Sequence, residues 1–362
     1  MELWSLGAIT FKLKVLARRL QRPFFYLIFS LMLPVIMVAT LALHDFFYKP
    51  LSIGDNYVIT VATGDTLGKI ALQLQQDEIL ANTRVLRWFA KFSQLASKIK
   101  VGEFLLADKM TAHDILNLLT SSKVKQYPFT IVEGSRLRDI LAAMRAHPKI
   151  KTTLTLGNEH LEIAQFMDLP EATSAEGLFL PDTYYFVAGT CDLQLLQRAY
   201  DAMTELLSST WLAKNEHVVV LKPYEALIIA SIIEKESHFP DEYPLIASVY
   251  HRRLAQNMRL QADPTIIYVL DDGNFNGRVL YKHLRMENSY NTYKNSGLPP
   301  TPIAMPSKAA IIAALQPADP DYLYFVANQE GRHVFSSDLD THNAAVATYR
   351  QLKAKQREQF KK

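Results

Sequence analysis

The sequence predicts an α+β protein in three parts: a single N-terminal transmembrane helix, a small α+β module and a larger mixed α+β domain. An apolar stretch of transmembrane length lies at residues 24–43. A strand–helix–helix–strand pattern follows within residues 55–125, and residues 126–362 combine apolar helical stretches, polar loops and a C-terminal strand pair. At 362 residues, 49% of them apolar and 21% charged, the chain has room for an anchor and two compact domains.

The first part is the stretch FFYLIFSLMLPVIMVATLAL, which carries no formal charge over its twenty residues. Twenty helical residues span about 30 Å, the thickness of the bilayer hydrocarbon, and Pro34 is tolerated within a membrane helix. Residues 1–23 hold five basic residues and one acidic residue, so their net charge is +4 and the rest of the chain carries −1. The positive-inside rule therefore predicts a cytoplasmic N-terminus and an exported body.

A cleaved signal peptide and a buried core helix are the alternatives for this stretch. The long basic leader, the length of the apolar run and the missing Ala-x-Ala site favour an uncleaved single-pass anchor. The nearly neutral body is not typical of a nucleic-acid binder. One cysteine, Cys191, excludes an intrachain disulfide, and ten histidines without HExxH spacing suggest no metal site. We therefore expect neither a metal nor another cofactor.

The small module is predicted for residues 55–125. Residues 57–62 alternate like a strand, and Gly64 and Thr66 supply a turn and a helix N-cap. Helices are expected after Thr66 and over residues 82–92, and residues 103–106 are expected to return as a strand. This order resembles a LysM-type module, and the resemblance implies a fold that binds peptidoglycan.

The most informative stretch of the larger domain is residues 223–237, an apolar helix with two carboxylates near its end. At about 100° per residue, Glu236 falls on the face of Ile232 and Ile233, whereas Glu234 points almost the opposite way. A carboxyl group on an apolar face loses hydration, so its pKa rises and it can act as a general acid near neutral pH. The alternative is a helix-terminal glutamate that turns to solvent.

Several loops of this domain are rich in turn-forming, polar and aromatic residues. Residues 176–184 are predicted to form a folded loop rather than a strand, and residues 258–265 to break a helix that covers residues 245–254. Ser307 is expected to cap a helix that ends near Leu315. Residues 322–327 and 333–336 are expected to pair as a hairpin.

Together these motifs resemble those of the YceG-like family. The resemblance is carried, in order, by IIEKE at 232–236, RLQADPT at 259–265, YNTY at 290–293, GLPP at 297–300 and YLYFVA at 322–327, with EGLFLPDTY at 176–184. It covers roughly residues 57–345. Members are membrane-anchored endolytic murein transglycosylases, so the resemblance implies a lyase of the inner (cytoplasmic) membrane whose catalytic domain, residues 126–362, is periplasmic or otherwise extracytoplasmic.

The resemblance also implies a site and a substrate. The second glutamate of the EKE triplet is the family's catalytic acid, which corresponds to Glu236. Weaker candidates for substrate contacts are Glu176, Gln261, Asp263, Tyr290 and Asn291. The expected partners are peptidoglycan glycan strands and peptidoglycan synthases (penicillin-binding proteins). Two other functions stay open, namely a non-catalytic scaffold of the wall-synthesis machinery and a muramidase that uses Asp263 or Glu176 as a second carboxylate.

Overall fold

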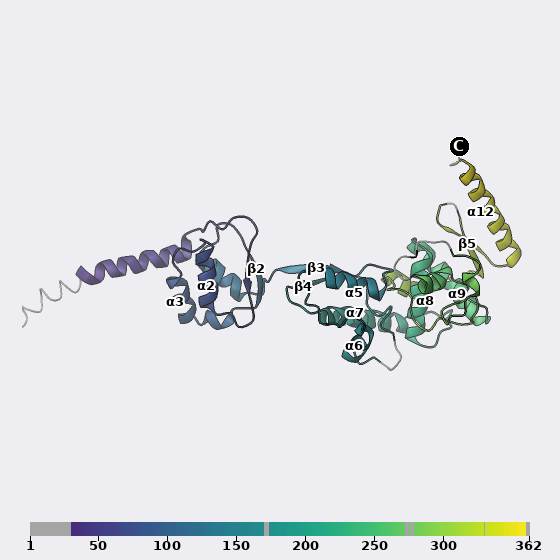
Figure 1. Cartoon of the computed structure of the whole chain (residues 1–362), viewed down its shortest axis with the longest axis horizontal. Coiled ribbons are helices and arrows are strands. Elements are labelled where there is room, and N and C mark those ends of the chain that lie inside the picture. Colours follow the sequence, from purple (N-terminus) through teal and green to yellow (C-terminus); the bar gives the residue numbers. More distant parts are fainter. Residues whose placement is uncertain (1–29, 170–173, 272–274, 276–278, 329, 360–362) are drawn as a thin grey trace, which may run out of the picture. The chain divides into compact units, whose positions relative to one another are not determined.

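The computed structural model describes residues 30–169, 174–271, 275, 279–328 and 330–359 (Figure 1). The chain divides into two compact units, residues 1–125 and 126–362. Both units combine helices with two-stranded antiparallel sheets, so the predicted α+β class is confirmed.

The first unit begins with the helix Ser30–Tyr48, which is long and apolar enough to cross a membrane. Most of its side chains are exposed. Residues 1–23, the predicted basic segment, and residues 24–29 of the predicted span lie outside the described residues.

The rest of this unit has the predicted strand–helix–helix–strand order. It consists of β1 (Tyr57–Val61), α2 (Leu67–Gln76), α3 (Arg84–Phe92), the 3-10 turn η1 (Leu95–Lys98), β2 (Gly102–Leu106) and α4 (Ala112–Thr120). Strands β1 and β2 pair antiparallel. Thr66 caps α2 by accepting a hydrogen bond from the Lys69 amide, as expected. The likeness to a LysM module stays a prediction.

The end of the helix Ser30–Tyr48 is part of the same core. Phe46 is buried with Ile59, Leu74 and Phe104, and its ring lies 4.9 Å from that of Phe89 on α3. The helix is therefore packed against the unit at its C-terminal end.

The second unit opens with a two-stranded antiparallel sheet of β3 (Gln126–Thr130) and β4 (Thr183–Val187), two strands that lie far apart in sequence. Helices α5 (Leu137–Ala146), α6 (Glu159–Phe166) and α7 (Asp192–Leu212) pack around it. The prediction of a loop over residues 176–184 is wrong for its last two residues, Thr183 and Tyr184. They join β4 because Tyr184 and Phe186 alternate inward and fill the core against Phe129.

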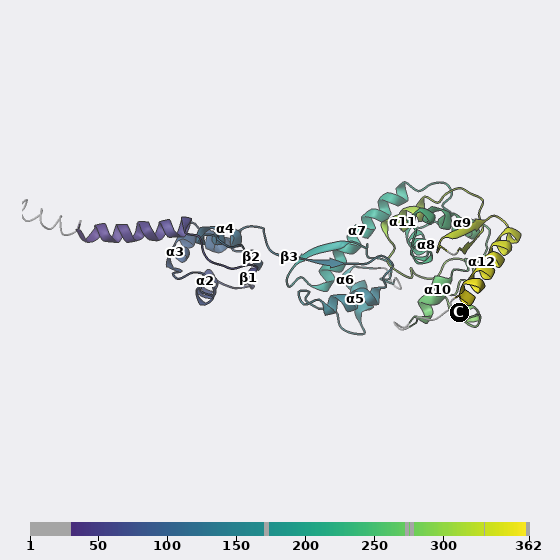
Figure 2. The same cartoon turned by 90° about the horizontal axis from the view of Figure 1, so that it is seen from above.

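Helix α8 (Pro223–Glu236) is the centre of the second unit. Every residue from Ala226 to Ile233 is buried, because α7, α9 (Tyr243–Ala255), α10 (Asp263–Leu270) and α11 (Lys308–Leu315) pack against it, as Figure 2 shows. A helix that is apolar all round is expected to be enclosed in this way. Ser307 caps α11 as predicted, by accepting a hydrogen bond from the Ala310 amide.

The remaining elements complete this unit. Two 3-10 turns, η2 (Pro240–Glu242) and η3 (His283–Arg285), lie in the connections. The predicted C-terminal hairpin is confirmed as β5 (Tyr324–Ala327) and β6 (His333–Ser336), with β5 beginning two residues later than expected. Helix α12 (Leu339–Gln359) follows and packs on both strands.

Candidate active site

The carboxyl group of Glu236 lies at the closed end of α8. The chain leaves the helix at Ser237, whose backbone is extended. As a residue Glu236 is only partly buried, yet protein atoms enclose its carboxyl group closely, and Ile232 and Ile233 on the same face are fully buried. The Tyr250 hydroxyl on α9 donates a hydrogen bond to Glu236 Oε1 over 2.5 Å. No protein donor among the described residues reaches Oε2.

This environment raises the pKa of Glu236 to about 7. Burial is the main cause, because a desolvated carboxyl group favours its neutral form. The hydrogen bond from Tyr250 works in the opposite direction, the negative charge of Asp263 raises the pKa further, and Arg253 lowers it. Near neutral pH a large fraction of Glu236 is therefore protonated, as a general acid requires.

Tyr250 and Arg253, which the sequence analysis did not single out, support this carboxyl group from α9. Tyr250 is 1% exposed, and burial followed by the charge of Glu236 raises the pKa of its hydroxyl, so it stays a donor. The buried Arg253 guanidinium donates to the backbone carbonyls of Leu260 and Leu323 over 2.8 and 2.7 Å. Their three-residue spacing on a helix was the available signal, since it places both on one face.

Asp263 is a second carboxylate near Glu236, at the first position of α10. It is exposed and accepts a hydrogen bond from the Tyr293 hydroxyl over 2.6 Å. Burial, and then this bond, raises the pKa of Tyr293. The structure thus brings one of the weaker candidates, Asp263, into the electrostatic surroundings of Glu236.

Glu234 contacts a different part of the unit. Its Oε2 accepts the Ser307 amide over 3.0 Å, and the neighbouring Ser231 hydroxyl accepts the Ile303 amide over 3.0 Å. Glu234 therefore lies at the N-terminus of α11, where a carboxylate is favoured by the helix dipole. Lys235 donates to the Gly134 carbonyl over 3.0 Å. Glu234 and Lys235 both lie beside Gly134, whereas Glu236 contacts Tyr250, which agrees with the predicted separation of the two glutamates.

Glu176 and Tyr290 belong to a second polar group. Glu176 is 4% exposed and accepts the Leu137 amide over 2.9 Å, at the start of α5, and the Tyr268 hydroxyl over 3.4 Å. The ring of Tyr268 lies 4.9 Å from that of Tyr290, whose hydroxyl is 2.8 Å from Thr301 Oγ1. Burial raises the pKa of Glu176. In the described part of the chain no hydrogen bond joins this group to Glu236.

Gly177, next to Glu176, fixes the approach of two loops. Its φ is +80°, and an added Cβ would lie 2.3 Å from Cβ of Pro302. Only glycine fits a left-handed residue in so close a contact. This contact holds the segment around Glu176 against the loop that contains Thr301 and Pro302.

Asn291 and Gln261 both form hydrogen bonds with backbone carbonyl groups of neighbouring loops. Asn291 is buried, and its amide nitrogen donates to the carbonyls of Leu284 and Met286. Gln261 is exposed with φ +52°, and its backbone amide donates to the Thr292 carbonyl. Their predicted substrate contacts stay predictions.

A buried carboxylate fastens the C-terminal hairpin beside the end of α8. Glu242 accepts hydrogen bonds from the Ser237 hydroxyl over 2.9 Å and from the His333 amide over 2.9 Å, and His333 Nδ1 lies 2.8 Å from it. Burial works to raise the pKa of Glu242, but these bonds outweigh it and lower the pKa. The residue after Glu236 is therefore tied to β6.

A family model described as the YceG-like family matches residues 59–348. The chain belongs to the YceG-like family.

Named relatives and a solved structure agree with this assignment. An endolytic murein transglycosylase of Bacillus subtilis is 31% identical over 309 residues, which cover 80% of this chain and 84% of the relative. One of Streptococcus pneumoniae is 26% identical over 326 residues, covering 80% of this chain and 58% of the relative. A crystal structure of a putative YceG-like protein from Listeria monocytogenes superposes with a TM-score of 0.50 at 28% identity, covering 80% and 99% of the two chains.

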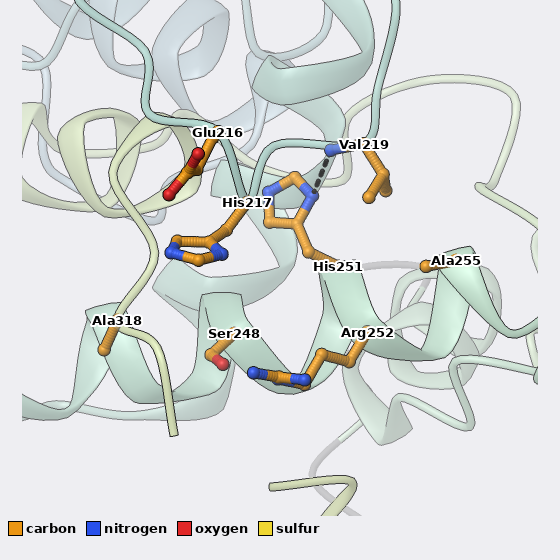
Figure 3. Close-up of a pocket in the computed structure, with 8 residues that line it drawn as sticks. All are labelled: Glu216, His217, Val219, Ser248, His251, Arg252, Ala255 and Ala318. Atoms are coloured by element: carbon orange, nitrogen blue, oxygen red, sulfur yellow. Dashed lines mark hydrogen bonds between the residues drawn. The ribbon is translucent and has the colours of Figure 1, made fainter. Parts of the chain in front are cut away.

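Two cavities in this YceG-like chain are not lined by Glu236. The pocket in Figure 3, about 180 Å³, is lined by His217, His251 and Arg252 among others. His251 accepts the Val219 amide through Nδ1 and contacts the Ala314 carbonyl through Nε2, so both ring nitrogens are engaged. An open cavity of about 600 Å³ lies on the Glu234 side of α8. Among the described residues no group of three or more His, Cys, Asp or Glu side chains is arranged to hold a metal ion.

Proposed function

We propose that this chain is an endolytic murein transglycosylase, a lyase that cleaves the β-1,4 bond between N-acetylmuramic acid and N-acetylglucosamine. Membership of the YceG-like family and the names of the relatives support this activity. The observation that carries the mechanism is the enclosed carboxyl group of Glu236, whose pKa is raised to about 7. An acid of this kind can donate a proton to a leaving-group oxygen near neutral pH.

In the proposed reaction one carboxyl group acts twice. Glu236 donates its proton to the glycosidic oxygen, and the bond from this oxygen to the muramoyl anomeric carbon breaks. The muramoyl 6-hydroxyl oxygen forms the new bond to that carbon, and its proton returns to Glu236. No water is consumed, and a 1,6-anhydro ring results. The substrate supplies the nucleophile, so the second carboxylate that hydrolytic glycosidases need is not required.

The neighbours of Glu236 fit this double role. Because Tyr250 occupies Oε1, Oε2 is the oxygen that carries the transferred proton. The hydrogen bond and the charge of Arg253 stabilise the carboxylate that forms after donation, whereas burial and Asp263 favour its reprotonation. These opposing effects keep both protonation states accessible to the same group.

The products test the proposal. The detergent-solubilised chain, incubated with peptidoglycan sacculi and with uncrosslinked glycan strands, should release fragments that end in 1,6-anhydromuramic acid. Mass spectrometry should find these ends one water lighter than the corresponding muramidase ends, because the ring closes without hydrolysis. They should also appear on internal fragments of the strand, as endolytic cleavage requires.

Two outcomes would contradict the lyase. Reducing muramic acid ends would indicate a muramidase, with Asp263 as the nearer candidate for a second carboxylate. Intact strands together with retained binding to sacculi would indicate a non-catalytic scaffold. A sample of the Glu236→Gln chain, prepared identically, controls for contaminating hydrolases.

The same proposal assigns parts and location to the chain. Residues 1–23 form a cytoplasmic segment, 24–43 a transmembrane helix, 55–125 a LysM-like module and 126–362 the catalytic domain. The division of the chain between residues 125 and 126 supports the last boundary, and the exposed apolar helix Ser30–Tyr48 supports the anchor. The catalytic domain then faces nascent glycan strands and penicillin-binding proteins outside the cytoplasmic membrane, where cleavage would terminate strand elongation.

Topology reporters test the orientation. An alkaline phosphatase fusion after residue 50 should be active in cells, because the positively charged leader keeps the N-terminus in the cytoplasm. A β-galactosidase fusion at the same position should be inactive. The opposite pair of activities would overturn the assigned orientation, and cleavage of the chain near residue 45 would indicate a signal peptide instead of an anchor.

A further inference from the structure

Helix α3 presents an apolar aromatic surface to solvent. Its buried face is formed by Leu86 and Ala90, while Trp88 and Phe92, one turn apart on another face, are 59% and 78% exposed. Their rings stack in parallel at 5.5 Å. Exposing two large aromatic side chains together is unfavourable in water, so contiguous surfaces of this kind mark interaction sites.

This surface is continuous with the helix proposed to span the membrane. An apolar cavity of about 390 Å³ lies between the two helices, and it is lined by Ala39, Ala42, Leu43, Arg84, Val85 and Trp88. Figure 1 shows α3 beside the C-terminal end of the helix Ser30–Tyr48, and β2 on the opposite side of the unit. The ring of Phe89, also on α3, contacts those of Phe46 and Phe47, which fixes this arrangement.

The level of α3 along the spanning helix follows from the sequence. Leu43 is the last residue of the uncharged stretch, and His44 and Asp45 are the first polar residues after it. With a rise of about 1.5 Å per residue, the lining between Ala39 and Leu43 covers the last turn before those residues. Trp88 therefore lies where hydrocarbon meets headgroups, the level at which tryptophan is enriched in membrane proteins.

The charges of α3 are also those expected for a helix at the boundary between hydrocarbon and headgroups. The helix carries three basic residues, Arg84, Arg87 and Lys91, and no acidic residue. All three are exposed. Long basic side chains beside a membrane-embedded aromatic face can extend to anionic phosphate groups while their methylene stems stay in the apolar layer.

We propose that α3 is an interfacial helix, which inserts Trp88 and Phe92 into the exported-side surface of the bilayer beside the spanning helix. Arg84, Arg87 and Lys91 contact the anionic headgroups. The inference rests on the proposed membrane anchor and not on the catalytic activity. It gives the first unit a second attachment to the membrane, and it makes this face of the unit unavailable to glycan.

Depth-dependent fluorescence quenching tests the position of Trp88. The sequence has three tryptophans, so Trp4→Phe with Trp211→Phe leaves Trp88 as the only one in the full-length chain. This chain is reconstituted into liposomes of phosphatidylcholine and phosphatidylglycerol. A lipid with a doxyl quencher near the headgroup should remove most of the Trp88 emission, and aqueous acrylamide should remove little.

A matched reporter is placed on the other side of the unit. Leu105 on β2 is exposed, and Leu105→Trp in a chain with all three tryptophans replaced by phenylalanine should show the reverse pattern. Circular dichroism of both chains checks that the substitutions preserve the fold.

Flotation of the liposomes separates the two proposals. A chain that does not float with the lipid contradicts the membrane anchor itself. A chain that floats but whose Trp88 is quenched by acrylamide, and not by the doxyl lipid, contradicts the interfacial helix alone. Protection of Trp88 from both quenchers means that a second copy of the chain covers it, which also overturns the proposal.

Discussion

Glu236→Gln abolishes glycan cleavage while the protein keeps its fold. The amide preserves the shape of the side chain and can still accept the hydrogen bond from Tyr250, but it has no acidic proton to donate. General acid–base catalysis by a positioned group is worth about 10²–10⁴-fold in rate, so we expect a loss of this size or larger. The rate of formation of 1,6-anhydro ends from purified glycan strands measures it.

Glu234→Gln is the matched control for this loss. The glutamine oxygen can still accept the Ser307 amide at the N-terminus of α11, so activity should stay near that of the wild type. If Glu234→Gln were inactive and Glu236→Gln active, the assignment of the catalytic acid would be wrong.

Thermal unfolding distinguishes a chemical loss from a structural one. The folded pKa of Glu236 lies above its ordinary value, so the wild-type protein loses stability as pH rises from that ordinary value through about 7. Glu236→Gln carries no such charge and should unfold at the same or a higher temperature at pH 8. A markedly lower Tm would mean that the variant lost activity through misfolding.

Cleavage by the wild-type protein falls as the pH rises above about 7, the pKa to which burial raises Glu236. Above that pH the acid is ionised, and kcat/KM should fall about tenfold per pH unit. Tyr250→Phe removes a hydrogen bond that favours the ionised form. The pKa of Glu236 should then rise further, and the alkaline limb of the profile should move to higher pH. Initial rates between pH 5 and 9, on one soluble glycan substrate, give both profiles.

Tyr243→Phe provides the comparison on the same helix. Its hydroxyl donates to the backbone carbonyl of Ser237 over 3.3 Å rather than to Glu236, so the alkaline limb should stay in place. An alkaline limb that moves to lower pH in Tyr250→Phe would show that Tyr250 favours the neutral acid, contrary to the hydrogen-bond geometry.

Local sequence signals were sufficient for much of the fold. Thr66 and Ser307 mark the starts of α2 and α11 through the hydrogen bonds of their hydroxyls, and unbroken apolar spacing marks α8. The loop predicted over residues 176–184 was too long because turn residues such as Pro181 and Asp182 hid the inward alternation of the residues that follow them. That alternation becomes decisive only when β3 is available as a partner, and the paired residues of β3 lie 53 to 61 positions earlier, from Thr130 with Thr183 to Gln126 with Val187.

The residues of the candidate site likewise fall into those that the sequence could predict and those that it could not. Helical geometry was enough to separate Glu236 from Glu234, because one period relates all residues of a single helix. It could not find Tyr250, since the approach of α9 to the end of α8 depends on packing between separate helices. The spacing likewise gave no means to place Glu176 and Asp263 in different groups, because their neighbours, Leu137 and Tyr293, come from distant segments.

The fastening of the C-terminal hairpin changes how partial genes of this kind should be interpreted. A truncated reading frame that stops after the GLPP motif at residues 297–300 would still encode Glu236 and most of the residues that identify the family. It would lack His333, which engages Glu242, and the carbonyl of Leu323, which accepts from Arg253. Glu242, which accepts from Ser237 at the end of α8, would lose its contacts with β6, and Arg253 on α9 would lose one of its carbonyl acceptors. Motif content alone therefore overstates which fragments in a genome can encode a working enzyme, and the reach of the frame through β6 is the better criterion.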